Sequence, residues 1–475
     1  MTPADRPIRA VAILAGAAMT FAVTQTLVVP ALPKIQQEFD VSPAATAWLI
    51  TGFLLTASIS IPLMGRLGDM YGKTKLLLLC FAVFSLGNLI STFGALEHSF
   101  AALVAGRAIT GIGAGLIPLS LGIVRDILPA HRVTLGVGLV ASTQGIGSGL
   151  GLVASGIIVD HASVAFIFAG SLPIATAVAI ATWRWVPEST ARTGARLDWP
   201  GALLLSLTLL ALLLSVSRGN AWGWTSLGVL GLLALAGIAG VAWAWWEKRA
   251  DDPMVDLEMM RERTVWTTNL VTIAAGFGMF ASFMLVPQFV QVPAASGYGF
   301  GASGTAAGLF MLPHSALMLV AGTLSGLLGT RYGSKIPLAL GSLVAAISYF
   351  SLAFVNDHGF EIYIGTALMG FGVGLTLASV ASLTVQAVAR QQTGVAMGMN
   401  AIMRLMGGAV GAQVAAAIIT AKPGADGFPT QAGFTIAFAV SSAAALLTLV
   451  LVAAVPSRPD SIVEHGPIAD AAAGI

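Results

Sequence analysis

Long apolar runs separated by short polar stretches occupy most of the chain. A transmembrane helix needs about 20 predominantly apolar residues to cross roughly 30 Å of hydrocarbon. Fourteen runs reach that length, namely residues 8–31, 46–64, 75–95, 101–124, 133–159, 163–183, 199–217, 226–246, 266–292, 304–328, 336–355, 361–388, 396–420 and 432–454. The pattern predicts an all-α integral membrane protein with fourteen transmembrane helices in a lipid bilayer.

The basic residues gather on one side of this predicted bundle. If the N-terminus lies inside the cell, eighteen of the 23 lysines and arginines fall on the cytoplasmic side, and Lys34, Arg218 and Lys422 fall outside. Cytoplasmic loops of membrane proteins carry an excess of Lys and Arg. We therefore expect a multi-pass protein of the cell (inner) membrane with cytoplasmic N- and C-termini.

Composition narrows the function further. Charged residues make up 9% and apolar residues 56% of the chain, against roughly 25% and 45–50% in soluble domains. Cys80 is the single cysteine, which excludes an internal disulfide framework. The net charge of +2 gives no reason to expect nucleic acid. Neither a metal-binding Cys/His spacing nor a phosphate-binding loop occurs, so we expect neither an enzyme nor a cofactor.

Two segments of the first half recur in the second half. The stretch Gly65–Lys75 returns in altered form at Gly326–Lys335, an offset of 261 residues, with Thr330 in the place of Asp69. The glycine pattern of Gly106–Gly115 returns at Gly365–Gly374, an offset of 259 residues. Two independent segments at nearly one offset indicate a duplication, from which many transporters are built.

The repeat predicts the domain organisation. We expect an N-terminal six-helix bundle over residues 1–190, a two-helix insertion with a cytoplasmic linker over 191–262, a C-terminal six-helix bundle over 263–455 and a cytoplasmic tail over 456–475. The charged stretch from Glu247 to Arg263 is most simply a solvated linker. Asp198, near the start of the first inserted helix, suits the positive end of the helix dipole.

Several motifs resemble those of known transporters. The Gly65–Lys75 stretch resembles the loop signature G-x-L-x-D-R-x-G-R-[KR] of the major facilitator superfamily. The first span ends in Ala31-Leu32-Pro33 and is similar to the motif L-D-x-T-I-V-N-V-A-L-P of fourteen-span drug:proton antiporters, although Thr24 replaces its aspartate. Gly147–Gly156 resembles the antiporter motif G-x-x-x-G-P-x-x-G-G, with Leu152 in place of the proline.

Two further motifs resemble the same subfamily. Asp198-Trp199-Pro200-Gly201 resembles the D-W-x-G opening of its extra helix pair, and Asn400–Gly411 resembles its pattern N-x-x-x-R-x-x-G-G-x-x-G. On these motifs the chain is identified as a member of the fourteen-span (EmrB/QacA-like) drug:proton antiporter family. The resemblance implies the major facilitator fold, with two six-helix bundles plus two extra helices. It also implies a central cavity that alternately opens to either side, and proton exchange.

The resemblance therefore implies a secondary active transporter that exports a small amphipathic molecule, whether drug-like, lipid or metabolite. Its partners would be the lipid bilayer, the small-molecule substrate and protons, with the proton gradient as its energy source, and we expect a monomer. An uptake symporter or a passive metabolite facilitator on the same fold is the first alternative. A membrane receptor or scaffold that transports nothing is the second.

The candidate site residues form three groups. The substrate and proton pathway is expected at polar positions within the spans: Thr24, Gln25, Arg107, Gln144, Gln288, His314, Asn400 and Arg404. A conformational latch that holds the cytoplasmic side shut is expected at Gly65, Asp69, Gly72, Lys73, Arg125 and Asp126. Close helix packing is expected at Gly147, Gly151, Gly156, Gly407 and Gly411, because small residues let helices approach closely.

Charges within the spans have two consequences. An arginine at membrane depth needs a wet cavity or a partner, and an unpaired Arg107 or Arg404 in a cavity would favour anionic or neutral ligands. All 21 acidic residues, by contrast, fall in predicted loops, tails or span ends. Three hypotheses for coupling remain open: protons move through a span-end acid such as Asp126, they move through His314, or transport is not coupled to protons.

Overall fold

The computed structural model describes residues 5–456 except 42, 47, 190–197, 252, 254, 256, 390–391 and 422–427. Arg192, Arg196, Arg390, Lys422 and the tail beyond residue 456, all used in the sequence argument, lie outside the described residues. The described chain is almost wholly helical. Its helices are α1 (Asp5–Leu27), α2 (Leu32–Phe39), α3 (Pro43–Thr46), α4 (Trp48–Tyr71), α5 (Lys73–Leu96), α6 (Phe100–Ile112), η1 (Gly113–Gly115), α7 (Leu116–Ile127), α8 (Ala130–His161), α9 (Ala165–Ala169), α10 (Ser171–Trp185), α11 (Trp199–Trp222), α12 (Leu227–Glu247), α13 (Leu257–Arg261), α14 (Arg263–Gln291), η2 (Ala294–Ser296), α15 (Gly304–Phe310), α16 (Leu312–Tyr332), α17 (Lys335–Phe354), α18 (Gly359–Ala387), α19 (Thr393–Thr420) and α20 (Gln431–Ala454).

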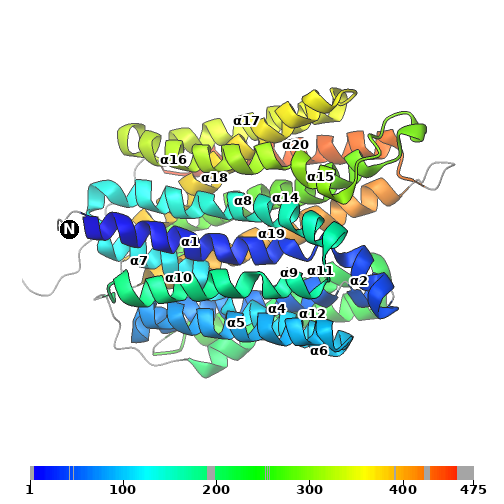
Figure 1. The fold of residues 1–475 in the computed structure, drawn as a ribbon. Coiled ribbons are helices and arrows are strands. Elements are labelled where there is room, and N and C mark those ends of the chain that lie inside the picture. Colours follow the sequence, from blue (N-terminus) through cyan, green and yellow to red (C-terminus); the bar gives the residue numbers. More distant parts are fainter. Residues whose placement is uncertain are drawn as a thin grey trace, which may run out of the picture.

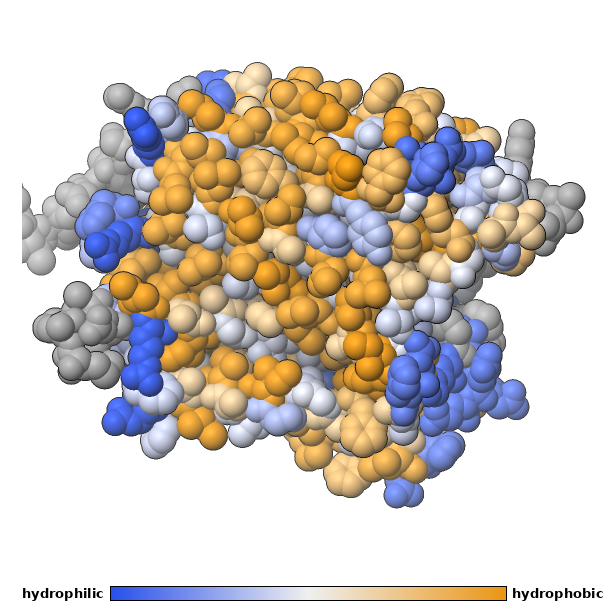
Figure 2. All heavy atoms as spheres, turned by 45° about the horizontal axis from the view of Figure 1, so that its top comes forward, coloured by the Kyte–Doolittle hydropathy of each residue, from blue (hydrophilic) through white to orange (hydrophobic). Residues whose placement is uncertain are grey.

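The described residues contain fourteen helical segments that are long and apolar enough to cross a membrane, which confirms the predicted count. The fourth is built from α6, η1 and α7, and the tenth from α15 and α16. The long helices lie side by side, with α16, α17 and α20 in the upper part of Figure 1 and α4, α5 and α6 in the lower part. The face of the bundle seen in Figure 2 is a broad apolar belt, and hydrophilic residues gather at its two ends.

The two ends of the bundle differ in charge. We call the end at which α1 begins and α4 ends the basic face, because Arg66, Lys75, Arg125 and Arg132 lie there. The other end, where α2 lies (Figure 1), is called the opposite face.

Each half of the chain packs mainly on itself. In the first half α1 contacts α8, α10 and α7, and α6 contacts α4 and α5. In the second half α14 contacts α19 and α20, and α16 and α17 both contact α18. Two seams join the halves: α4 packs on α19, and α8 packs on α16 and α18.

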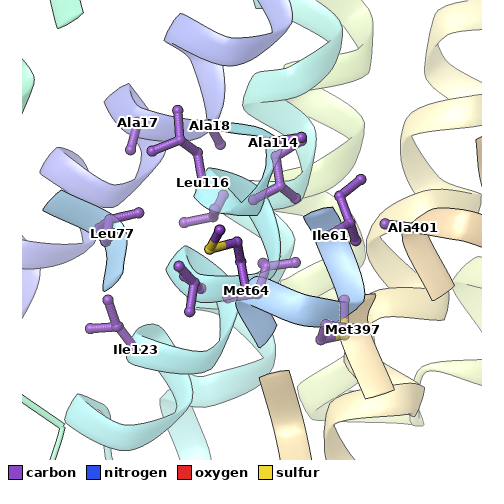
Figure 3. Packing of buried hydrophobic residues seen from close by; sticks show 14 of the residues in the cluster. Ala17, Ala18, Ile61, Met64, Leu77, Ala114, Leu116, Ile123, Met397 and Ala401 are labelled. Atoms are coloured by element: carbon purple, nitrogen blue, oxygen red, sulfur yellow. The ribbon is translucent and has the colours of Figure 1, made fainter. Parts of the chain in front are cut away.

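The largest apolar cluster crosses the first of these seams. Figure 3 shows Ile61 and Met64 of α4 on the side of Met397 and Ala401 of α19, with side chains from α1, α5 and α7 further to the left. All these side chains are buried. In the membrane, lipid tails are as apolar as the core, so such contacts stabilise the bundle through close packing rather than through the hydrophobic effect.

The stretch from Glu247 to Arg263 is not a simple solvated linker. Glu247 is 3% exposed, accepts hydrogen bonds from the indole of Trp243 and from the backbone of Val255, and closes the end of α12. Val255 and Met259 belong to the large apolar cluster. The prediction of a solvated linker was therefore wrong for these residues, because Val255 and Met259 are buried in the apolar cluster. Asp198 does begin α11, where its side chain accepts a hydrogen bond from the Gly201 backbone.

Candidate functional site

A cavity of about 730 Å³ lies between the two halves. Its lining comes from α1, α2, α3, α4, α6, α7 and α8 of the first half, from α14, α15, α16, α18 and α19 of the second, and from α11. Gln291 and Gly304 line it near the opposite face and are exposed to solvent. Toward the basic face the lining ends at the apolar residues Ile61, Ile117 and Met318. The cavity therefore extends toward the opposite face only.

The cavity wall is mostly apolar, with neutral polar groups spaced around it. Phe21, Phe53, Phe280 and Phe283 supply aromatic rings. Six glutamines line it as well: Gln25, Gln36, Gln144, Gln288, Gln291 and Gln413. Among the described residues, the lining includes two arginines and not a single carboxylate. An amphipathic molecule finds apolar surface and hydrogen-bonding amides here.

The two arginines of the cavity have different surroundings. Arg107 is 1% exposed and donates hydrogen bonds to the carbonyls of Leu49, at 3.2 Å, and Thr24, at 3.3 Å. Its guanidinium also lies 4.3 Å from the centre of the Phe53 ring. Arg404 lines the cavity but makes neither a hydrogen bond nor an ion pair within the described chain. Arg107 is thus tied into the wall, whereas Arg404 is available to a ligand.

The other predicted pathway residues differ in whether they line the cavity. Gln25, Gln144 and Gln288 line the cavity. Thr24 does not; it is buried, and its hydroxyl donates to the Thr20 carbonyl. Asn400 joins α19 to α14 by donating to Asn269, at 3.2 Å, and to Thr272, at 2.7 Å.

His314 is fully buried and is not part of the cavity lining. Its ring packs edge-on against Phe283, with 5.5 Å between the ring centres. Phe283 itself lines the cavity. His314 therefore lies one layer behind the cavity wall, packed against Phe283.

At the basic face, charged groups join α4 to the start of α19. Asp69 is fully buried and accepts a hydrogen bond from the backbone N–H of Val395, at 3.3 Å, in the first turn of α19. Backbone N–H groups and the helix dipole at this end both favour a negative charge. A Cβ atom added to Gly65 would lie 2.5 Å from the Gly394 carbonyl oxygen, so the two helices approach too closely for any side chain here.

Lys73 and Arg125 complete this cluster. The Lys73 ammonium lies 3.2 Å from Asp69 and 2.8 Å from Asp126, which also accepts a hydrogen bond from Ser189. Arg125 donates to the Thr393 hydroxyl and to the Val388 carbonyl, both at 2.6 Å, and so joins α7 to the second half. Two acids and two bases balance, which is the condition under which buried charges are tolerated.

Gly72 shapes the turn between α4 and α5. Its φ of 111° is open to glycine but strained for other residues. The next helix begins at once, and the Glu188 carboxylate accepts hydrogen bonds from the N–H groups of Thr74 and Lys75. Glu188 and Ser189 were not among the predicted site residues. Only their position after the sixth span pointed to this face, and sequence spacing does not reveal that they meet Asp126 and α5.

The five predicted packing glycines all lie at helix contacts. A Cβ on Gly147 would lie 2.7 Å from the Met19 carbonyl oxygen, and one on Gly151 would lie 2.5 Å from that of Val23, so α8 presses on α1. Gly156 lies against Thr305 of α15. Gly407 and Gly411 leave room for the α14 backbone at Ile273 and Phe277.

Comparison with known proteins fits this architecture. The family model for the Major Facilitator Superfamily matches residues 14–312, 200–412 and 268–471. Multidrug resistance protein Stp of Mycobacterium tuberculosis (strain CDC 1551 / Oshkosh) is 28% identical over 82% of this chain and 72% of its own length. The tetracenomycin C resistance and export protein of Streptomyces glaucescens is 28% identical over 90% of this chain and 80% of its own.

Solved structures share the fold. The human organic anion transporter MFSD10 superposes with a TM-score of 0.65 over 95% of this chain and 100% of its own, at 18% identity. The proton:xylose symporter XylE superposes with a TM-score of 0.67 over 96% of this chain and 97% of its own, at 15% identity. The fourteen spans and the drug-resistance relatives agree with the resemblance to the fourteen-span drug:proton antiporters. The chain belongs to the Major Facilitator Superfamily and is a multi-pass membrane transport protein rather than an enzyme.

Proposed function

We propose that the protein exports an amphipathic small molecule across the cell membrane by alternating access. The observation that carries the proposal is the cavity between the halves, which ends at apolar residues toward the basic face and extends to exposed residues at the opposite face. Beyond its apolar end, Asp69 and Arg125 join the two halves at the basic face. With the basic face cytoplasmic, as the excess of Lys and Arg favours, this is the state from which cargo leaves the cell. The two drug-resistance relatives support the direction.

In this proposal residues 1–190 and 263–455 move as two bodies. Loading requires that the α4–α19 contact separate at the basic face, so that Asp69 loses the Val395 N–H and Arg125 loses Thr393. Water replaces both partners in the open state, which limits the cost of separation. The cluster then acts as a latch that favours the closed basic face without fixing it.

The cargo of this cavity is anionic or neutral. Arg404 offers an unpaired positive charge, and a carboxylate that would attract a cation is missing from the described lining. In an apolar cavity an unpaired charge acts strongly because little water screens it. Tetraphenylborate and tetraphenylphosphonium have one shape and opposite charge, so a competition assay with the two ions tests the proposal directly.

We propose that tetraphenylborate protects a cysteine placed at Gln144 from thiol labelling at lower concentration than tetraphenylphosphonium does. Arg404→Gln should remove the difference between the two ions, and Arg107→Gln should act mainly through local packing because its guanidinium is tied to carbonyls. Stronger protection by the phosphonium ion would refute the electrostatic part.

Proton antiport is the proposed source of energy. Of the two candidate carriers, Asp126 lies in the basic-face cluster, 2.8 Å from Lys73, whereas His314 lies behind Phe283. Protonation of an acid in the cluster would weaken the latch, which links proton binding to opening. Passive facilitation is the second candidate function, because Thr24 and the described cavity lining offer no acid that would exchange a proton for cargo.

Two experiments test these functions in order. A growth-inhibition panel on cells with and without the gene identifies a cargo. Flux of that compound is then measured in proteoliposomes with the pH gradient imposed or collapsed, and again with Asp126→Asn and His314→Ala. Antiport predicts that collapse abolishes uphill export and that Asp126→Asn mimics the collapse; flux that ignores the gradient would establish the facilitator. If labelled cargo does not exchange at all, the protein is a receptor or scaffold rather than a transporter.

A further inference from the structure

The two helices of the insertion have unlike surroundings. α11 packs on α12, on α4 of the first half and on α19 of the second half. α12 packs chiefly on α11, and its Ile238 and Val241 are 70% and 74% exposed toward the apolar belt. Both helices are long and apolar enough to span the membrane, but α11 carries Ser206, Thr208, Ser215 and Ser217, whereas α12 has neither a serine nor a threonine. One helix of the pair bridges the two halves, and the other faces lipid.

One stripe of α11 carries its contacts with the bundle. Ala202, Leu205, Leu209 and Leu213 follow at spacings of three and four residues and are each less than 8% exposed. Residues at this spacing share one helix face. The first three belong to the large apolar cluster near the basic face. Leu213 and, four residues on, Ser217 line the transport cavity.

Polar contacts fix this part of α11 to α4. The hydroxyl oxygens of Ser217 and Thr51 lie 3.0 Å apart, and Thr51 also lines the cavity. One residue further, the Arg218 guanidinium lies 4.5 Å from the centre of the Trp48 ring. A hydrogen bond at membrane depth and a cation–π contact at the interface hold the helix in place.

The seam that α11 covers is closed near the basic face only. There α4 and α19 touch directly, since a Cβ on Gly398 would lie 3.2 Å from the Ile61 carbonyl oxygen. Nearer the opposite face, Thr51 and Leu54 of α4 and Gln413 of α19 all line the cavity. A gap between these helices would admit acyl chains from the bilayer unless another element filled it.

We infer that α11 is a wall of the transport cavity. It closes the α4–α19 seam against lipid and presents Leu213 and Ser217 to the cargo, so the insertion contributes to cargo selection. α12 then serves as the return span, because a single inserted helix would invert the membrane orientation of every later span. The contact with cargo rests on the proposed export function, whereas the wall is a geometric claim that stands by itself.

Thiol labelling tests the wall. Cys80 is the single cysteine and is buried, so a Cys80→Ala chain gives a clean background. Ser217→Cys and Gln144→Cys should both react with the membrane-impermeant sulfonatoethyl methanethiosulfonate, and tetraphenylborate should slow both reactions. Ile238→Cys, on the lipid-facing helix, should react at least tenfold more slowly. Labelling of Ser217→Cys at the slow rate of Ile238→Cys would overturn the inference.

A larger side chain on the cavity side of α11 tests the contact with cargo. Ser217→Trp should lower export of the compound identified by growth inhibition at least tenfold, because the indole enters the cavity. Ile238→Trp, in a lipid-facing position of the same insertion, should leave export within twofold and controls for folding and membrane insertion. Normal export by Ser217→Trp would refute cargo contact even if labelling supports the wall. If the unmodified protein itself does not export the compound, the proposed function is refuted instead.

Discussion

The two copies of the duplicated turn, Gly65–Lys75 and Gly326–Lys335, share their backbone and differ in their chemistry. In each copy a glycine with positive φ follows the end of the first helix, 111° at Gly72 after α4 and 84° at Gly333 after α16. Both also begin with a glycine at a contact between the halves. A Cβ on Gly65 would lie 2.5 Å from the Gly394 oxygen, and one on Gly326 would lie 2.7 Å from the Leu135 Cα. Duplication has therefore kept the geometry of close helix approach.

Asp69 and Lys73 of the first turn have uncharged counterparts, Thr330 and Ser334, in the second. Asp69 is buried and reaches across to Val395, whereas Thr330 is exposed and its hydroxyl donates to Leu327 of its own helix. Lys335 stays within its half, where its ammonium donates to the Val455 carbonyl at 2.6 Å. The ion cluster thus belongs to one seam only.

The other seam is neutral and continuous. Along α8, Gly138, Gly145, Gly149 and Gly156 lie successively against α16 and α15, from the basic face to the opposite face. Near the basic face, Gln386 of α18 donates to the Thr134 hydroxyl at 3.0 Å. The α4–α19 seam, by contrast, is packed only near the basic face and then diverges around the cavity. We therefore propose that the first seam opens during transport and that the second acts as the permanent joint.

Substitution of Gly65 and Gly326 should give the largest difference between the two seams. Gly65→Val places a side chain against the Gly394 backbone, and overpacking of this kind typically costs about 1–3 kcal/mol. We expect export to fall more than tenfold, with a cysteine at Gln144 becoming accessible to impermeant thiol reagents from the basic face in inside-out vesicles. Gly326→Val should instead lower the melting temperature, because its seam is packed in every state. Equal labelling in both variants would remove the distinction between the seams.

Asp69→Asn comes next. It removes the charge that binds Lys73 and the start of α19, and we expect export to fall about tenfold, equivalent to roughly 1.4 kcal/mol. Expression and melting temperature should stay near those of the unmodified protein. Thr330→Val, at the matching position of the exposed copy, is the control and should change neither measurement. Export at the unmodified level in Asp69→Asn would exclude the latch.

Arg125→Gln should have a smaller effect. It loses the bonds to Thr393 and Val388 but leaves the Asp69 contact in place, so we expect export to fall several-fold and basic-face labelling of the Gln144 cysteine to rise. Lys335→Gln breaks a contact within one half. It should shift the melting temperature and leave labelling unchanged. If Lys335→Gln changed the labelling and Arg125→Gln did not, the second copy of the turn, and not the first, would hold the basic face shut.

Gln386→Ala should have the smallest effect. A neutral hydrogen bond contributes about 0.5–1.5 kcal/mol to stability, but a bond that persists in every state does not bias the transport cycle. We expect export within twofold and a melting temperature slightly lower. Thr134→Val removes the same bond from the other side and should behave alike. A tenfold loss of export in either variant would show that the α8–α18 contact also opens.

The sequence predicted the number of spans and their approximate positions, because crossing hydrocarbon demands about 20 apolar residues whatever the helix packs against. The second span, predicted over residues 46–64, continues as a helix to Tyr71. The sequence also indicated which turn carries charge, since Asp69 and Thr330 stand at matching positions. These properties depend on composition and order along the chain alone.

The tertiary structure decided which side chains meet. Thr24 and Gln25 are neighbours, yet only Gln25 lines the cavity, and Arg107 and Arg404 are alike in sequence but only Arg404 is unpaired. The serines of α11 set it apart from α12, but only the structure shows that Leu213 and Ser217 line the cavity. Because lipid tails and a membrane protein's core are equally apolar, the hydrophobic pattern that orients a helix in a soluble protein is missing, and facing follows from packing alone.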